Sequence, residues 1–378
     1  SYDGGRPVTV YVPPDPPVPP VPPAPPLPPG LPVPPVPPEP PVPPAPPLPP
    51  VAPDAPTGEI KPLYRPEVAA YLANQRQAAS LFVHSLHDRL GEAEWPDGSG
   101  ARDEVWRPSA WLRVVGRDGH SRTRDRGFAV DTDASLVQTG AVLAHWQTGS
   151  GQGTLQLGGM LGYGNARNDA SAADNPARAH GRTEGWSLGA YITWYARPPG
   201  AEGLYLDGWA IHGRYRNTVQ GDGLPDVRHD ARTWAVSAET GYALRLGQGS
   251  GWWLEPQLQL VHLNLDDADS IEVNGTRVAG TDASGWSARI GMRTHRTWLS
   301  FSSRFQPYLT FNWWHDRVPD RLAFNGVQLG ELYPDDVYEL KLGANTWLGP
   351  AWSAWGNIGY QRGEQGYSEV IVRAGARY

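Results

Sequence analysis

The chain has 378 residues, a net charge of -7, 39% hydrophobic residues and a mean hydropathy of -0.48. No run of 18 apolar residues occurs, which excludes a transmembrane helix, and the acidic balance argues against nucleic acid as a partner. The absence of Cys excludes disulfides and thiol chemistry. The 17 Trp and 16 Tyr are instead typical of a membrane β-barrel, whose aromatic side chains favour the lipid–water interfaces.

Residues 1–63 form a Pro-rich segment. Repeats of Val-Pro-Pro, Ala-Pro-Pro and Leu-Pro-Pro fill the tract from Pro13 to Pro50. Proline lacks a backbone donor, so we expect an extended polyproline II rod that acts as a stalk, with a ligand for Pro-binding domains as the alternative. Ser1 is preceded by neither an initiator Met nor a signal peptide, so we interpret the chain as part of a longer precursor.

Residues 64–95 predict one α-helix from Pro66 to Leu90. Pro66 suits the first helical position and Gly91 suits the C-terminal cap. One face is apolar, with Val68, Leu72, Ala79, Phe82, Leu86 and Leu90, and the others are polar, with Asn74, Gln75, Arg76, Gln77, His84, Ser85 and His87. At 1.5 Å per residue the helix is roughly 38 Å long. It is long enough to cross a bilayer but too polar to face lipid, so we expect it inside a polar lumen.

After a linker at residues 96–108, residues 109–378 show a period of two. From Trp186 to Trp194, for example, apolar residues alternate with small or polar ones, which predicts a strand with one face toward lipid. Such patterns predict an all-β membrane barrel of about 12 antiparallel strands around the helix. The strands centre near Val114, Gly140, Gly159, Ala190, Ala210, Ala238, Leu258, Ile290, Leu309, Leu342, Gly356 and Val372.

Two further features favour an outer-membrane barrel. Aromatic residues end several apolar faces eight residues apart, or roughly 26 Å along a strand. The connections also alternate between short turns and long loops, as in outer-membrane barrels. The expected long loops are Asp118–Asp131, Asn165–Arg182, Gln220–His229, Asp266–Asp282 and Asp316–Asp335, and the short turns include Thr148–Gly151, Pro198–Ala201, Gly247–Gly249 and Leu348–Pro350.

Several charged residues fall on the inward face of the predicted strands. They are Glu239, Glu255, Arg289, Arg293, Glu339 and Lys341. Arg at the bilayer midplane costs about 2–4 kcal/mol when it faces lipid, so these side chains should point into the lumen. They form either a polar wall that contacts the helix or ordinary lumen solvation, and the sequence leaves both open.

No catalytic centre is evident in the sequence. The pairs His87-Asp88, His229-Asp230 and His315-Asp316 are adjacent residues, which point to opposite faces of a strand. Neither G-x-S-x-G nor H-E-x-x-H occurs. His84 and His87 form at most half of a metal site, with no partner cluster in the sequence. We therefore expect no enzyme activity, no metal and no cofactor.

The last strand has one apolar face, formed by Val370, Val372, Ala374, Ala376 and Tyr378. Its other face carries Glu369, Arg373 and Arg377, which cannot face lipid without a large free-energy cost. The apolar face should therefore meet lipid, and the strand should pair with the first strand near Leu112 and Val114 to close the barrel.

The order of these parts resembles one family. A Pro-rich stalk, the sequence Tyr64-Arg65-Pro66-Glu67-Val68, one helix and a barrel that ends in an aromatic residue are similar to monomeric autotransporters, particularly the pertactin-like branch. Leu86-His87-Asp88-Arg89-Leu90-Gly91-Glu92 resembles the family's helix end. Trp111-Leu112-Arg113 resembles its first strand, and Gln306-Pro307-Tyr308 with Asn312-Trp313 resembles a late strand. The resemblance covers about Tyr64 to Tyr378.

The resemblance implies a translocator and anchor in the Gram-negative outer membrane, with the helix through the lumen and the Pro-rich segment at the cell surface. Implied partners are outer-membrane lipid, the barrel-assembly machinery, periplasmic chaperones and the chain's own passenger, and the barrel is a monomer. The final strand with Tyr378 is the implied assembly signal. Family branches that cleave the passenger use an Asn-Asn junction, whereas Asn74 precedes Gln75 here. A porin-like diffusion channel and a barrel hydrolase are the alternatives, and the polar helix disfavours the former.

Overall fold

The computed structural model describes residues 64–92, 109–149, 152–198, 201–247, 249–280, 283–299, 303–348 and 352–378. The expected polyproline II segment (1–63) and the linker (96–108) lie outside these residues. Among the described residues, no helix is long and apolar enough to cross a membrane.

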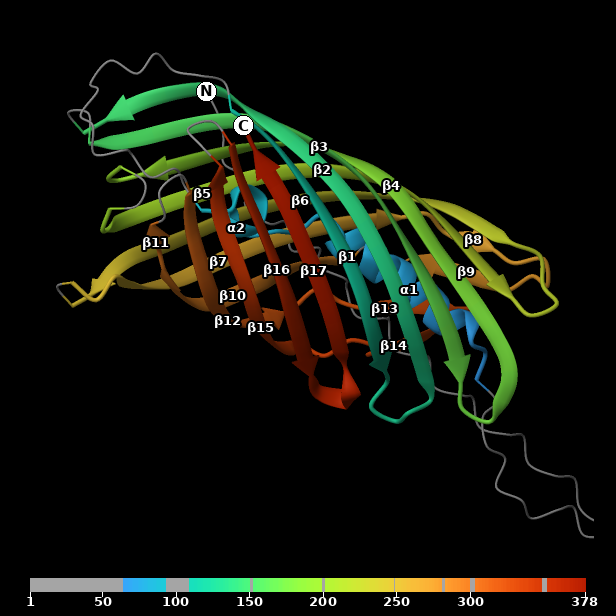
Figure 1. Ribbon diagram of the computed structural model, residues 1–378. Helices are drawn as coiled ribbons and strands as arrows, with labels where there is room; N and C mark the ends of the chain where they lie inside the picture. Colours follow the sequence, from blue (N-terminus) through green and yellow to red (C-terminus); the bar gives the residue numbers. More distant parts are fainter. Residues whose placement is uncertain are drawn as a thin grey trace, which may run out of the picture. The chain divides into compact units, whose positions relative to one another are not determined.

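Twelve long antiparallel strands close into a barrel, and each expected strand centre falls in one of them (Figure 1). The strands are β1 (Ala110–Arg122), β2 (Phe128–Thr148), β3 (Gly153–Ala172), β4 (Asn175–Tyr195), β5 (Gly203–Gly221), β6 (Val227–Leu246), β7 (Trp252–Asp267), β10 (Ala283–Arg296), β12 (Ser303–Asp316), β15 (Asp336–Leu348), β16 (Trp352–Gly363) and β17 (Ser368–Arg377). A two-residue strand, β11 (Trp298–Leu299), adds to β12. The pairing of Leu112 with Ala376 and of Val114 with Ala374 joins β1 to β17, so the predicted closure is confirmed.

Two belts of exposed aromatic side chains bound the apolar outer surface. The outer belt consists of Tyr163, Trp186, Trp234, Trp286, Tyr338 and Tyr360. The inner belt, at the end where the chain terminates, consists of Trp146, Tyr242, Trp252, Trp298, Phe305, Trp352 and Tyr378. Exposed Leu, Ile and Val side chains lie between the belts, as in the strand from Trp186 through Leu188 to Ile192. Amphipathic rings at two interfaces with apolar side chains between them form the outer surface of a membrane barrel.

Three expected long loops are mostly strand. β1 continues to Arg122 and β3 to Ala172, so the loops expected at Asp118–Asp131 and Asn165–Arg182 shrink to tight turns, and the loop expected at Gln220–His229 keeps only residues 222–226. Above the outer belt, the outer faces of these strands become charged, while the inner faces carry buried apolar and uncharged polar side chains such as Ala166, Ala170 and Asn168. The charged outer faces suggest loops in the sequence, but continuous pairing and packing on the inner face keep the backbone in strands.

The two remaining long connections form a second sheet at the outer end of the barrel. It has the order β14 (Val327–Gly330), β13 (Arg321–Phe324), β9 (Arg277–Gly280) and β8 (Ser270–Ile271). Asp320 supports its edge, because its carboxylate accepts hydrogen bonds from the backbone N–H groups of Leu332 and Tyr333 at 2.7 and 2.9 Å. Burial raises the pKa of Asp320. The connection before β17 is a short turn, η1 (Glu364–Gly366).

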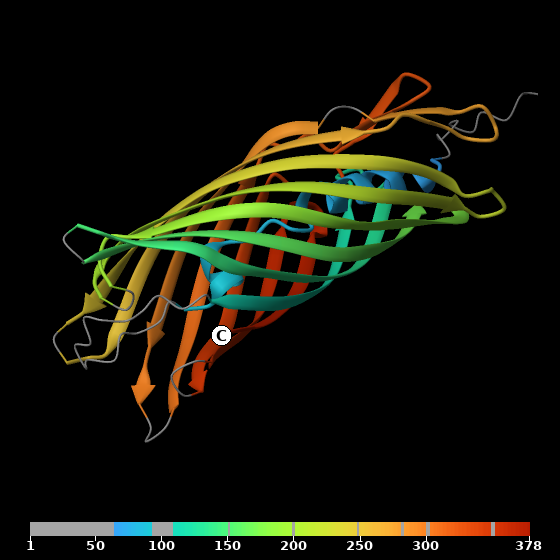
Figure 2. The same ribbon diagram turned by 90° about the horizontal axis from the view of Figure 1, so that it is seen from above.

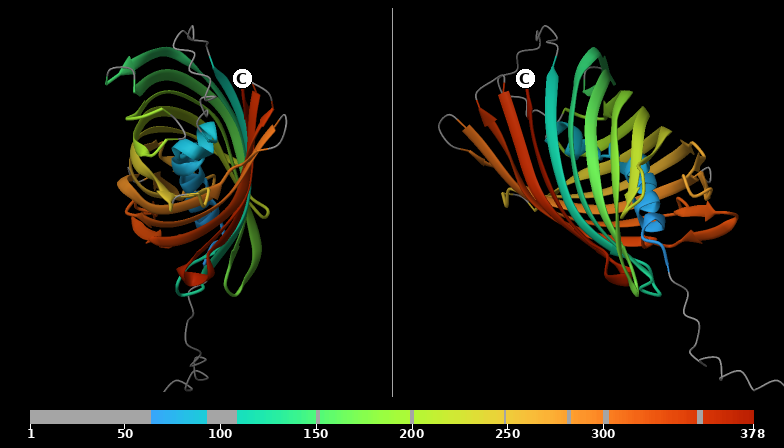
Figure 3. Two further views of the ribbon diagram at one scale, coloured as in Figure 1. Left: turned by 60° about the vertical axis from the view of Figure 1, so that its left-hand side comes forward. Right: turned by 90° about the vertical axis from the view of Figure 1, so that its right-hand side faces the viewer.

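The segment inside the barrel, residues 64–92, contains one helix of more than seven residues as expected, α1 (Glu67–Ser80). It ends before Leu90, however, and a second, short helix follows, α2 (Leu86–Leu90); both lie inside the ring of strands (Figures 2 and 3). Between them, the carbonyl of His84 accepts hydrogen bonds from Trp209 and Gln259 on the barrel wall. Ser85 then caps α2 by accepting from the N–H of Asp88. The wall satisfies backbone groups that a continuous helix would satisfy internally, so the helix can break here.

A closed barrel without free strand edges should resist unfolding by detergent at room temperature. We expect unboiled protein in mild detergent gels to migrate differently from boiled protein, and circular dichroism to show mainly β-structure. Heat-insensitive migration together with a helical spectrum would contradict the architecture.

Candidate functional site: the contact between the internal segment and the barrel wall

The internal segment, residues 64–92, runs from one end of the barrel to the other. At the end that carries the second sheet, the Tyr64 ring lies 5.2 Å from that of Phe128, and Arg65 forms an ion pair of 2.7 Å with Glu272. At the opposite end, where the chain terminates, Arg377 donates to the carbonyl of Glu92 at 3.4 Å. The segment therefore spans the barrel.

In the outer half, α1 packs among apolar side chains of the extended strands. Val68, Ala69, Ala70, Tyr71, Leu72 and Ala73 are buried with Phe128, Val130, Ala170, Ala179 and Val219. Tyr71 stacks on His229 with ring centroids 5.5 Å apart, and burial raises the pKa of Tyr71 to about 12. The strands extend beyond the membrane band because their inner faces bury this helix.

Asn74 forms the polar contact of α1 with the wall. Its side chain donates to the carbonyl of Thr218 at 3.0 Å and accepts from Asn168 at 2.8 Å, and all of it is buried. Gly181 allows this approach, because a Cβ at that position would lie 2.6 Å from the Asn74 Oδ1 atom. A buried amide with both ends paired fixes the position of the helix along the lumen.

The next two polar residues of α1 differ in their surroundings. Gln75 is buried, whereas Arg76 is partly exposed and forms an ion pair with Asp316 at the start of the second-sheet connection. The Arg76 guanidinium also lies over the ring of Tyr333, 5.3 Å from its centroid. Arg76 therefore contacts both ends of the connection between β12 and β15 and stabilises the position of α1 beside it.

Between the helices, His84 stacks on Trp209 with ring centroids 4.9 Å apart and an interplanar angle of 16°. Its Nδ1 atom lies 2.8 Å from the carbonyl oxygen of Phe82. His84 is thus a packed residue of the break between α1 and α2.

Two charged residues of α2 pair with opposite charges on the wall. Asp88 accepts from the Lys341 ammonium at 2.8 and 3.0 Å, and the Nε atom of Arg373 lies 3.7 Å away. Arg89 donates to both carboxylate oxygens of Asp207, at 2.6 and 3.2 Å, and both side chains are fully buried. These two pairs lie on different sides of the short helix and fix its rotation about its own axis.

The end of the segment repeats this pattern. His87 Nε2 lies 2.6 Å from the carboxylate of Glu255, and Glu92 forms an ion pair with Arg293. Together with Asp88 and Arg89, this gives four polar side chains within residues 87–92 that each contact a complementary group on the wall. Such complementarity sets the register of the segment in the lumen.

The six charged residues expected to line the lumen are all buried. Four contact the segment directly: Glu255, Arg293, Lys341 and Glu239, whose carboxylate accepts from the N–H of Leu86 at 2.9 Å. Arg289 and Glu339 instead pair with other wall residues. Arg289 lies 2.9 Å from Glu239, and Glu339 lies 3.0 Å from Arg373. They orient the groups that touch the segment.

The sequence did not identify Asp207 and Trp209 on the wall, nor Asp88, Arg89 and Glu92 as contacts on the segment. It placed Arg373 on the face away from lipid but named no partner for it. Asp207 and Trp209 lie on β5, whose alternation is masked in the sequence because Gly208, Ala210 and His212 occupy its outer face. Asp88, Arg89 and Glu92 lie within the motif that carries the family resemblance. The sequence did offer one signal for these three residues. Acidic and basic side chains lie close together in a helix that is expected inside a barrel, which indicates charged partners on the wall.

The His-Asp dipeptides do not form dyads with their sequence neighbours. His87 faces Glu255 while Asp88 faces Lys341, and His315 lies 2.8 Å from Asp336. His229 lies 3.4 Å from Asp267. His229 and His315 therefore each have a carboxylate partner on a neighbouring wall strand, as in cross-strand pairs, and His87 has one across the lumen contact.

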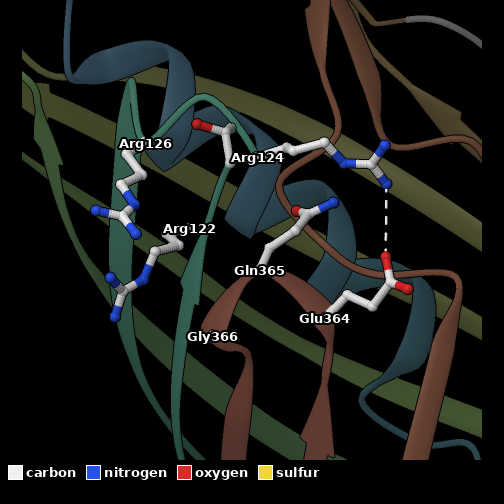
Figure 4. A pocket seen from close by; sticks show the side chains of 7 residues that line it. Arg122, Arg124, Arg126, Glu364, Gln365 and Gly366 are labelled. Atoms are coloured by element: carbon white, nitrogen blue, oxygen red, sulfur yellow. Dashed lines mark ion pairs between the residues drawn. The ribbon is translucent and has the colours of Figure 1, made fainter.

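A pocket of about 560 Å³ lies at the outer rim, between the β1–β2 turn and η1. Arg124 reaches Glu364 at 3.5 Å, whereas Arg122 and Arg126 point to the other side of the turn (Figure 4). Both partners of the ion pair are about three-quarters exposed, so it contributes little to stability. The pocket is separate from the lumen contacts and belongs to the rim.

The comparisons with known proteins agree with this geometry. Residues 110–359 match the model of the autotransporter β-domain. The chain is 32% identical over 330 residues to uncharacterized protein YdeU of Escherichia coli strain K12, covering 84% of this chain and 70% of that protein. It is 26% identical to the autotransporter adhesin AIDA-I of Escherichia coli, covering 83% of this chain and 25% of the adhesin.

Solved structures show the same fold. The crystal structure of the transport unit of AIDA-I matches with a TM-score of 0.73 and 26% identity, over 83% of this chain and 99% of that one. The translocator domain of NalP from Neisseria meningitidis matches with a TM-score of 0.52 and 19% identity, over 72% and 88%. The closed barrel of twelve strands, the internal segment and the matched β-domain together show that the chain belongs to the autotransporter family, as an outer-membrane translocator of type V secretion.

Proposed function

We propose that residues 64–92 stay in the lumen after export, where they plug the barrel and anchor the exported passenger to it. The observation that carries this proposal is the path of the segment, from Phe128 at the outer end to Arg377 at the inner end. The charges of α2 are paired with the wall, which is the arrangement of a resident segment. Its position at the end of translocation supports an anchor role.

The filled lumen also bears on the order of events. Arg89, Asn74 and Gln259 are fully buried in its interior. A folded passenger could not pass beside the segment, so export precedes folding outside the cell. Passenger folding then supplies a driving force that does not need ATP.

A porin-like diffusion channel is less well supported. An open channel leaves its lumen side chains in water, whereas Glu239, Arg289, Arg293 and Glu339 are each at most 3% exposed. A barrel hydrolase also lacks support among the described residues, because the histidines near carboxylates lie at separate places in the barrel. We propose that this domain has no catalytic role.

Biogenesis and location complete the proposal. Periplasmic chaperones and the barrel-assembly machinery would deliver the chain as a monomer into outer-membrane lipid, with β17 as the recognised strand. The Pro-rich segment would lie at the cell surface as a stalk. Its attachment to Tyr64 at the end of the barrel with the longer connections supports this placement, because those connections face the exterior in outer-membrane barrels.

Deleting residues 64–95 should raise the single-channel conductance in planar bilayers several-fold, because it removes the two helices that fill the lumen. A matched control replaces Arg182 and Glu184, an ion pair on the exposed outer face, with Ala, which should leave conductance near that of the parent protein. Unchanged conductance after the first deletion would mean that the segment does not obstruct the pore.

A further inference from the structure

At the inner end of the lumen, three side chains bring possible metal-ligand atoms together. A carboxylate oxygen of Glu92, a carboxylate oxygen of Glu255 and a ring nitrogen of His295 lie within 4.8 Å of one another. Glu255 and His295 come from the neighbouring wall strands β7 and β10, and Glu92 comes from the internal segment. His87 of α2 joins the cluster, since its Nε2 atom lies 2.6 Å from Glu255.

We propose that Glu92, Glu255, His87 and His295 bind one divalent transition-metal ion of the Zn²⁺ class, which fastens the internal segment to the barrel wall. Two imidazoles and two carboxylates without a thiol form a donor set that Zn²⁺ accepts. Tetrahedral zinc places its ligand atoms roughly 3.3 Å apart, so the cluster needs only small side-chain rotations to close around an ion. Glu92, the least buried of the three clustered donors, has the most freedom to make them.

The contacts of His87 indicate a cation at this place. Its Nδ1 atom lies 3.3 Å from the carbonyl oxygen of Gly91, and its Nε2 atom faces the carboxylate of Glu255. A protonated imidazole satisfies both contacts by donating from both ring nitrogens, so a positive charge suits this place. A metal ion between Nε2 and Glu255 would take the place of the Nε2 proton and leave Nδ1–H to donate to Gly91, the usual outer contact of a histidine ligand.

His295 provides the second indication. Only 6% of the residue is exposed, and its Nδ1 atom has no hydrogen-bond partner within the described part of the chain. Its ring is stacked on Trp253 at 6.0 Å with an interplanar angle of 2°, which fixes its orientation. A buried polar atom without a partner is unfavourable, and coordination would relieve that cost.

The charges of the cluster suit a divalent ion. Glu92 and Glu255 contribute two negative charges, and Arg293 contributes one positive charge through its ion pair with Glu92. The Arg293 guanidinium also lies 4.4 Å from the centroid of the Tyr308 ring, so it is held to one side. In the neutral form that metal ligation requires of both histidines, the four ligands and Arg293 carry a net charge of -1 around the ion. The ion would then join two residues of the segment to two of the wall.

The test is calorimetric titration of the full chain, refolded in detergent, purified through a tag without histidine and stripped with chelator. We expect ZnCl₂ to bind at one site per chain, to release protons and to raise the thermal midpoint of unfolding, whereas MgCl₂ does neither. His295→Phe keeps the ring stacked on Trp253 but removes the ligand. Its affinity for Zn²⁺ should fall by more than the roughly 10–100-fold that loss of a ligand's hydrogen-bond partner causes.

His180→Ala is the matched control, because His180 also lies 2.6 Å from a carboxylate, that of Asp169, but on the exposed outer face. It should leave zinc affinity unchanged. If His295→Phe does not refold, as judged by heat-dependent migration, Glu255→Gln replaces it. An absence of stoichiometric binding by the parent chain, or equal affinity in the parent and His295→Phe, would overturn the proposal. Neither result depends on export or conductance.

Discussion

Tyr378→Ser should nearly abolish the outer-membrane level of the protein and leave unfolded chain in the periplasm for proteases. Tyr378 is exposed on the lipid side of the final strand, and its ring lies 5.0 Å from that of Trp352 in the inner aromatic belt. Its backbone exchanges two hydrogen bonds with Ala110 on β1, at 2.9 and 3.0 Å. The substitution keeps these bonds and removes only the ring, so a large loss would reflect recognition during assembly.

Tyr360→Ser is the matched control, because Tyr360 is an exposed ring of the outer belt. If Tyr378 is only one more interfacial anchor, the two variants should show equal and mild losses, since each removes one amphipathic ring from lipid. Membrane fractionation with quantitative immunoblotting separates the outcomes. Equal mild losses would remove the recognition role of Tyr378 and leave the barrel itself standing.

The strand count could be predicted from the sequence because each strand crosses lipid with one face. The alternation from Trp186 to Trp194 is dictated by a requirement that acts on every second residue, and the structure places this face outward. How far each strand continues beyond the outer belt could not be predicted. Above the belts no lipid selects apolar residues, so Asn165, Arg167 and Asp169 on the outer face of β3 resemble a loop although they are paired in a strand.

The lumen site was predicted in part for a related reason. Charged residues such as Glu255 and Lys341 can be assigned to the inner face of a strand, because its other face must be apolar to meet lipid. Their partners Asp88 and Arg89 lie on a helix, where charges are ordinary, and the break before α2 depends on hydrogen bonds from Trp209 and Gln259. Those contacts join residues more than 100 positions apart, which no local pattern in the sequence encodes.

The largest effect on stability is expected from Asp207→Ala. The fully buried carboxylate of Asp207 accepts two hydrogen bonds from Arg89 and one from Thr193 at 2.5 Å. The Arg89 guanidinium also lies 4.1 Å from the centroid of the Tyr191 ring. Removing the carboxylate leaves a buried cation without its counter-ion, which destabilises a folded protein by about 3–5 kcal/mol. We expect this loss in guanidinium unfolding, with frequent channel openings in planar bilayers.

Two controls separate burial from charge pairing in general. Arg182 and Glu184 form an ion pair of 2.9 Å on the exposed outer face, so Arg182→Ala should change the free energy of unfolding by about 0–1 kcal/mol. The double variant Arg89→Met with Asp207→Leu removes both buried charges at similar volume. It should recover much of the stability that Asp207→Ala loses, because it also removes the cost of desolvating the cation.

The double variant also distinguishes the stability of the folded protein from the position of α2 in the lumen. Apolar side chains at residues 89 and 207 restore burial but not the directional contact that fixes the rotation of α2. The variant should therefore unfold near the parent's guanidinium midpoint and still open more often than the parent in bilayers. If the double variant opens as rarely as the parent, burial alone holds the segment in the lumen. If Asp207→Ala is as stable as Arg182→Ala, the Arg89–Asp207 pair is not buried as described.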